Sequence, residues 1–217
     1  MIAADLPLVL LSGFEPFGGD DRNPSWEVAD RLDGEPVEDE AGRPVARVRS
    51  LRLPCAFGEA FDVLDAAIRQ LDPIAVVALG LDASRPDIAI ERVAINLDDA
   101  RIPDNRGRQP RDEPVCPGAP AAYWSGLPVK AIVAALQEAR IPASLSNSAG
   151  TFVCNHVFFA LAHHLAGLGG KRFPAGFIHL PWAVPEDAGG GVAFDTLVAG
   201  VRLALRVTVA REGRRSG

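Results

Sequence analysis

The chain has 217 residues, of which 48% are hydrophobic and 23% are charged, and its formal net charge is −6. These values are ordinary for a soluble globular protein, and the length suits a single domain over residues 1–217, or at most two small ones. The acidic balance argues against a general nucleic-acid binder. No window offers about 18 consecutive apolar residues, so no transmembrane helix is expected.

Two observations concern the cellular compartment. The N-terminal stretch MIAADLPLVLLSGFEPFGG contains no basic segment, and its apolar run is too short for a signal peptide. Cysteines 55, 116 and 154 are odd in number and too sparse to form a disulfide framework. We therefore expect a protein of the reducing cytoplasm.

Two kinds of pattern alternate along the chain. Short apolar runs ended by Gly or Pro predict buried strands at 7–12, 73–80 and 175–182, and residues 46–54, 88–97 and 142–148 are also strand-like. Helical spacing predicts helices at 23–32, 57–71, 129–140, 148–165 and 192–211. Residues 34–45 and 101–128 are rich in Pro, Gly and charge, which predicts exposed connections. This order indicates an α/β fold with a mostly parallel sheet covered by helices on both faces.

Residues 148–165, SAGTFVCNHVFFALAHHL, hold Cys154 together with His156, His163 and His164. Two metal ligands on one helix face need a separation of three or four residues, whereas Cys154 and His156 would lie about 200° apart. The spacings also differ from those of structural zinc sites, so we expect no metal and no cofactor. We expect His163 and His164 to be solvated or to interact with the helix dipole.

The segment GFEPFGG follows the first predicted strand and precedes a helix. It matches neither the dinucleotide-binding fingerprint nor the P-loop. Its two aromatic residues, Phe14 and Phe17, indicate an apolar pocket, or else simply belong to the core.

Cys154 is a candidate nucleophile because the pKa of a thiol falls at a helix N-terminus beside a histidine. Thr151 or Ser148 could cap that helix. The alternative is a buried cysteine that acts as a small hydrophobic residue.

A base for Cys154 must come from another element, because His156 would lie on the wrong face of the same helix. His179 ends the apolar run GFIH, where the carboxyl end of a strand would meet a site. Glu91 is a carboxylate in an apolar setting that requires a partner, and it could orient an imidazole. Its alternative is a salt bridge to one of three arginines, Arg85, Arg92 or Arg101.

Four separated segments resemble pyroglutamyl peptidase type I, also called pyrrolidone-carboxylate peptidase. They are GFEPFGG with NPSWE (13–27), ERVAINLDDARIPDN (91–105), AGTFVCNH (149–156) and GFIHLP (176–181). The resemblance implies a three-layer αβα sandwich around an open, mostly parallel mixed sheet. It also implies a cytoplasmic cysteine peptidase, commonly a homotetramer, that needs no metal and removes N-terminal pyroglutamyl residues from peptides.

By this resemblance Cys154 is the nucleophile, His179 the base and Glu91 the orienting acid. The resemblance places Phe14 and Phe17 in the pyroglutamyl pocket, Asn23 in the support of their loop, and Arg101 near the oxyanion. Beside Cys154, Phe152 and Val153 are expected to help shape the pocket wall. Leu81 stands where the family often has a glutamine near the substrate, since the chain reads GLDASR in place of GQAGGR. Two other functions stay open, a different cysteine amidase on the same scaffold and a catalytically silent binding protein.

Overall fold

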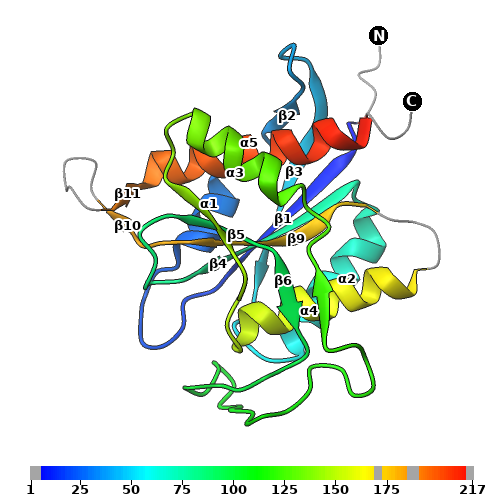
Figure 1. Cartoon of the computed structure of the whole chain (residues 1–217), viewed down its shortest axis with the longest axis vertical. Coiled ribbons are helices and arrows are strands. Elements are labelled where there is room, and N and C mark those ends of the chain that lie inside the picture. The colour runs from blue at the N-terminus through cyan, green and yellow to red at the C-terminus, as the bar shows by residue number, and fades with distance from the viewer. Residues whose placement is uncertain (1–5, 169–172, 185–190, 214–217) are drawn as a thin grey trace.

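A computed structural model describes residues 6–168, 173–184 and 191–213 (Figure 1). Its main sheet has seven strands in the order β2-β3-β1-β4-β9-β5-β8. In chain order these strands are β1 (Leu8–Phe14), β2 (Pro36–Glu38), β3 (Pro44–Leu53), β4 (Ala75–Leu81), β5 (Ile88–Glu91), β8 (Ala143–Ser146) and β9 (Ala175–Leu180). Strands β3, β1, β4 and β9 are mutually parallel, while β2 and β5 pair with antiparallel neighbours. The sheet is therefore mixed but mostly parallel, as predicted.

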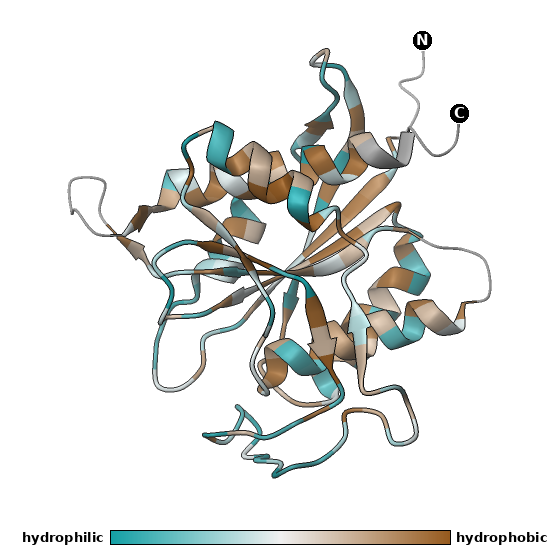
Figure 2. Ribbon diagram, in the orientation of Figure 1, coloured by the Kyte–Doolittle hydropathy of each residue, from teal (hydrophilic) through white to brown (hydrophobic). Residues whose placement is uncertain are grey.

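Helices cover both faces of this sheet, which gives the predicted three-layer arrangement (Figure 1). One face carries α1 (Pro24–Arg31), α3 (Val129–Glu138) and α5 (Phe194–Gly213), and the other carries α2 (Glu59–Leu71) and α4 (Val153–Gly167). The central strands are buried on both faces and so read as apolar runs; Figure 2 shows β1 largely in the brown of hydrophobic residues. Alternate residues of each strand thus feed two separate cores, one under each helix layer.

Two predicted connections contain strands. Residues 34–45 include β2, an edge strand that places Val37 in the core and its charged neighbour Glu38 in solvent. Residues 101–128 include β7 (Ala122–Trp124), which pairs with β6 (Val93–Ile95) in a two-stranded sheet. Strands β2 and β7 are each only three residues long, too short for a periodic pattern to appear in the sequence.

The strand predicted over 88–97 is two strands. The chain leaves the main sheet after Glu91 and starts β6 at Val93, which packs beside α4. This break matters for the site, because it carries the segment after Glu91 from the sheet to the helix layer. A further short pair, β10 (Ala183–Val184) and β11 (Val192–Ala193), precedes α5. Within the described ranges, no helix is both long and apolar enough to cross a membrane.

Candidate active site

Glu91, Cys154 and His179 come from β5, α4 and β9, and they meet on the sheet face covered by α2 and α4. Phe177 of β9 packs into the core under α2 and α4. Alternate residues of a strand point to the same face of a sheet, so His179, two residues further along β9, points to this face as well. Gly80 of β4 is paired with His179 in the ladder and points to this face too. The floor of the site is therefore formed by Gly80 and His179 on adjacent strands.

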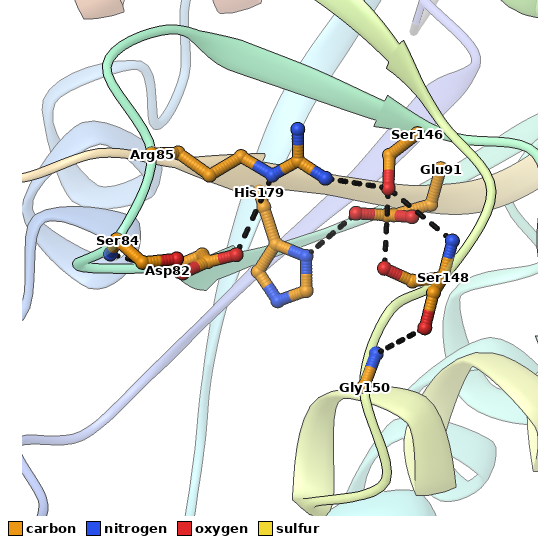
Figure 3. A network of polar contacts seen from close by, with 8 residues as sticks. All are labelled: Asp82, Ser84, Arg85, Glu91, Ser146, Ser148, Gly150 and His179. Atoms are coloured by element: carbon orange, nitrogen blue, oxygen red, sulfur yellow. Dashed lines mark hydrogen bonds and ion pairs between the residues drawn. The ribbon is translucent and has the colours of Figure 1, made fainter.

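The His179 ring is held by Glu91. Its Nδ1 lies 2.9 Å from Oε1 of Glu91, and the carboxylate is fully buried (Figure 3). A carboxylate at Nδ1 fixes the tautomer that carries a proton there and leaves Nε2 as the basic nitrogen. Figure 3 shows Nε2 pointing away from Glu91. Among the described residues Glu91 forms no ion pair with an arginine, so the alternative salt bridge is not found.

Gly80 fixes the position of the Cys154 sulfur. A Cβ atom built on Gly80 would lie only 2.9 Å from Sγ of Cys154 and 2.8 Å from the ring of Phe177. The sulfur thus stands directly over the ladder position next to His179. Paired residues on adjacent strands are about 5 Å apart, so this arrangement places the thiol beside His179 on the same face of the sheet. Only a glycine at position 80 leaves the space for it.

The first turn of α4 has no side-chain cap, contrary to the expectation for Thr151 and Ser148. Phe152 is the N-cap residue, and the hydroxyl of Thr151 instead donates to the carbonyl of Asp99 at 2.7 Å. The Oγ of Ser148 accepts from the N–H of Gly150. The uncapped N–H groups of the first turn beside Cys154 are consequently available to stabilise a negatively charged oxygen.

Burial opposes ionisation of the Cys154 thiol. Burial raises the pKa of Cys154 well above its ordinary value, and the neighbouring ionisable groups Cys55, Glu91 and Asp82 raise it further. A backbone hydrogen bond at the helix start acts in the opposite direction but is outweighed. The expected lowering of the pKa at the helix N-terminus is thus wrong for the resting state, because desolvation dominates. Attack by Cys154 must therefore involve proton transfer to a nearby base.

The chain holds a second histidine–carboxylate pair, but this one is structural. His156 Nδ1 lies 2.7 Å from Oδ2 of Asp98, and its Nε2 accepts a hydrogen bond of 3.0 Å from the N–H of Gly58. Because both ring nitrogens are hydrogen-bonded, His156 is not available as a base. Its bonds instead link α4 to the start of α2. This agrees with the prediction that His156 faces away from the nucleophile.

His163 and His164 are half-buried and paired rather than solvated. His163 Nδ1 lies 2.8 Å from the hydroxyl of Tyr123, and His164 Nδ1 lies 3.2 Å from Asp65. Both partners come from other elements, so the helical pattern of residues 148–165 alone could not predict them. In the part of the chain that the structure describes, no group of three or more His, Cys, Asp or Glu side chains has a geometry that could hold a metal ion.

Aromatic rings gather at the N-terminus of α4. Phe152 lies 5.9 Å from Phe17 and 5.4 Å from Phe57, measured between ring centroids. Phe17 and Phe152 are half-buried, as residues that line a pocket would be, whereas Phe14 and Val153 are buried in the core. Phe57, which the sequence analysis did not select, completes the cluster.

The remaining predicted pocket residues occupy different settings. The Asn23 side chain is buried and supports the loop: it accepts from the N–H and hydroxyl of Ser25 and donates to the carbonyl of Glu15. Arg101 is exposed. Leu81 pairs with Leu180, which faces the other core, so alternation points it away from Cys154.

Asn155 is a buried residue that sequence reasoning missed. Its side chain accepts from the N–H of Ile95 and donates to the carbonyls of Ile95 and Leu97. These bonds attach the segment after Glu91 to the helix turn that carries Cys154. The only sequence signal was a polar side chain in an otherwise apolar helical stretch.

A thiol at a helix N-terminus, beside an imidazole that a carboxylate orients, is the arrangement of a cysteine hydrolase on an α/β scaffold. The family model described as pyroglutamyl peptidase matches residues 8–211. The chain is 53% identical over 208 residues to a pyrrolidone-carboxylate peptidase of Chromobacterium violaceum, covering 94% of this chain and 93% of the relative. It is 52% identical to that of Klebsiella pneumoniae, with coverage of 96% and 94%.

Solved structures agree with these relatives. Pyroglutamyl peptidase I of Bacillus amyloliquefaciens superposes with a TM-score of 0.86 at 39% identity, covering 94% of this chain and 97% of the other. A variant pyrrolidone carboxyl peptidase of Pyrococcus furiosus gives a TM-score of 0.84 at 38% identity, with coverage of 94% and 99%. The chain belongs to the pyroglutamyl peptidase family of cysteine peptidases.

Proposed function

We propose that the protein hydrolyses the amide bond after an N-terminal pyroglutamyl residue through a Cys154–His179–Glu91 triad and a thioester intermediate. The observation that carries the proposal is the sulfur of Cys154 over Gly80, next to an imidazole whose Nδ1 lies 2.9 Å from Glu91. The family membership supports the substrate class.

In the acylation step, Nε2 of His179 takes the thiol proton while Sγ of Cys154 bonds to the carbonyl carbon that follows the lactam ring. The resulting oxyanion is stabilised by backbone N–H groups at the start of α4, where no side chain caps the helix; one such donor is typically worth about 3 kcal/mol. Glu91 stabilises the imidazolium that forms. The imidazolium then protonates the leaving amine as the carbon–nitrogen bond breaks.

In the second step, water attacks the thioester with His179 as the base. The carbon–sulfur bond breaks, free pyroglutamate leaves, and the proton returns to Cys154. Because the lactam is neutral, its pocket needs apolar walls and a few hydrogen-bonding groups rather than a charge. We assign the walls to Phe17 and Phe152, with Phe14 and Val153 packed behind them. Asn23 supports the loop that carries Phe17. Arg101 lies exposed at the outside of the site. Leu81 contributes only through the packing of its strand.

We further propose that residues 1–217 form one peptidase domain that works in the cytoplasm as a homo-oligomer, a tetramer in the form that the resemblance implies. One seven-stranded sheet and a family match over 8–211 support the single domain. Three free cysteines support a reducing compartment. Light scattering after size-exclusion chromatography measures the oligomer directly.

The substrate class is tested by the rates on pyroglutamyl, prolyl and glutaminyl anilides. We expect turnover of the pyroglutamyl compound alone, since an N-terminal proline carries a charge and lacks the ring carbonyl. Equal or faster turnover of glutaminyl anilide would identify a different amidase. No turnover of any anilide by folded protein would favour the silent binding protein.

A further inference from the structure

Asp82 follows the last residue of β4 and continues the alternation of that strand. Gly80 points to the catalytic face and Leu81 away from it, so Asp82 returns to the catalytic face. Its backbone N–H donates to the carbonyl of Leu180 at 2.9 Å, which holds it beside His179 on the neighbouring strand. Figure 3 shows the imidazole between two carboxylates, with Glu91 at Nδ1 and Asp82 on the other side.

Both oxygens of the Asp82 carboxylate are held in place. Oδ1 accepts hydrogen bonds from the hydroxyl of Ser84 at 2.6 Å and from its N–H at 3.0 Å. Oδ2 lies 3.4 Å from Nε of Arg85, whose Nη2 donates to Oγ of Ser146 at 2.7 Å (Figure 3). A surface aspartate in a simple turn does not need this bridge from β4 to β8, so the orientation of the carboxylate is specified by the fold.

The carboxylate responds to the charge of the imidazole. Burial acts to raise the pKa of Asp82, but the hydrogen bonds from Ser84 and the positive charges of His179 and Arg85 outweigh it, so the pKa is lowered. The charged and titratable groups that face His179 are Glu91 from β5, Asp82 and Arg85 from the loop after β4, and Cys154 from α4. The two carboxylates favour the imidazolium, while Arg85 partly offsets Asp82.

We propose that Asp82 is a second acidic positioning residue of the site, which stabilises the His179 imidazolium formed when Cys154 gives up its proton. The inference rests on the proposed role of His179 as the base. It assigns a function to a residue outside the Cys–His–Glu set, and it explains why Ser84, Arg85 and Ser146 are arranged around a single partly exposed carboxylate.

The test is the pH dependence of kcat/KM on a pyroglutamyl anilide. Removal of a nearby negative charge makes the loss of a proton easier at each ionisable group of the site. Asp82→Asn should therefore move both limbs of the bell-shaped profile to lower pH by roughly half a unit or more, and should lower kcat more than it raises KM. Arg85→Met should move both limbs to higher pH, because it exposes the full charge of Asp82.

Asp30→Asn is the matched control, since it removes the same charge from an exposed position on α1, across the sheet, and should leave the profile unchanged. If Asp82→Asn is too slow for a full profile, the pH dependence of Cys154 alkylation by iodoacetamide reports the same titrations. A lower rate with both limbs of the pH profile at their wild-type positions would show that Asp82 only stabilises the turn after β4, which overturns the proposal. A rise in KM alone would make it a substrate contact, which also overturns it. Inactivity of the wild-type protein would instead refute the proposed function.

Discussion

Gly80→Ala tests the placement of the nucleophile, because the added methyl group would occupy the space of the Cys154 sulfur. The new Cβ would lie 2.9 Å from Sγ and 2.8 Å from two ring carbons of Phe177. Non-bonded heavy atoms prefer separations of about 3.5–4.0 Å, so the sulfur must move by roughly 0.6–1.1 Å, or the strand must yield by as much. A misplacement of about 1 Å in a catalytic site costs on the order of a hundredfold in rate.

We therefore expect Gly80→Ala to lower kcat/KM on a pyroglutamyl anilide by about two orders of magnitude. Overpacking should also cost about 1–3 kcal/mol of stability, which lowers Tm by several degrees in a chain of this size. Gly167→Ala is the matched control, because a Cβ there meets nothing within 4 Å and should leave the rate unchanged. A folded Gly80→Ala protein that keeps more than half of the wild-type kcat/KM would refute the placement of Cys154 over β4.

Further measurements address individual contacts of the site. Glu91→Gln keeps the shape but loses the charge that stabilises the imidazolium, and should lower kcat by roughly a hundredfold or more at similar KM; a change below threefold would remove Glu91 from the mechanism. His156→Asn breaks the links to Asp98 and Gly58, and should cost about 1–3 kcal/mol in thermal unfolding while leaving kcat within a few-fold. Loss of activity without loss of stability would contradict the structural role of His156. Because the pKa of Cys154 is raised, its alkylation by iodoacetamide should still accelerate with pH at pH 9, whereas a plateau below pH 8 would indicate a resting thiolate. Incubation with a chelator should leave the anilide rate unchanged, and strong inhibition would revive a metal site.

The predicted strands and helices account for the fold because both periodicities are strong in this chain. Apolar runs such as 73–80 become strands buried on both faces, and helical spacing such as 57–71 becomes a helix. The short strands β2 and β7 escaped detection, since three residues carry no periodic signal. The residue types at Glu91 and His179 could be selected from sequence because a buried carboxylate and a strand-end histidine both require a partner.

Other features of the site depend on register and on contacts between distant segments, which local patterns do not encode. The direction of Leu81 follows from its pairing with Leu180, one residue out of phase with Gly80 and His179. The pKa of Cys154 is set by burial under other elements, which outweighs the helix start that the sequence reveals. The side chain of Asn155 acts on a segment about 60 residues away. Strand register and burial by distant segments are thus the two properties of the site that the sequence pattern could not predict.

The central claim is that Cys154 carries the pyroglutamyl group as a thioester, and intact-protein mass spectrometry of a rapidly quenched reaction tests it most directly. With a pyroglutamyl anilide as substrate, the wild-type protein should gain the mass of one pyroglutamyl group, and peptide mapping should locate it on Cys154. The Cys154→Ala protein should gain no mass and release no aniline. An acyl group on any other residue, or full turnover by Cys154→Ala, would contradict the account.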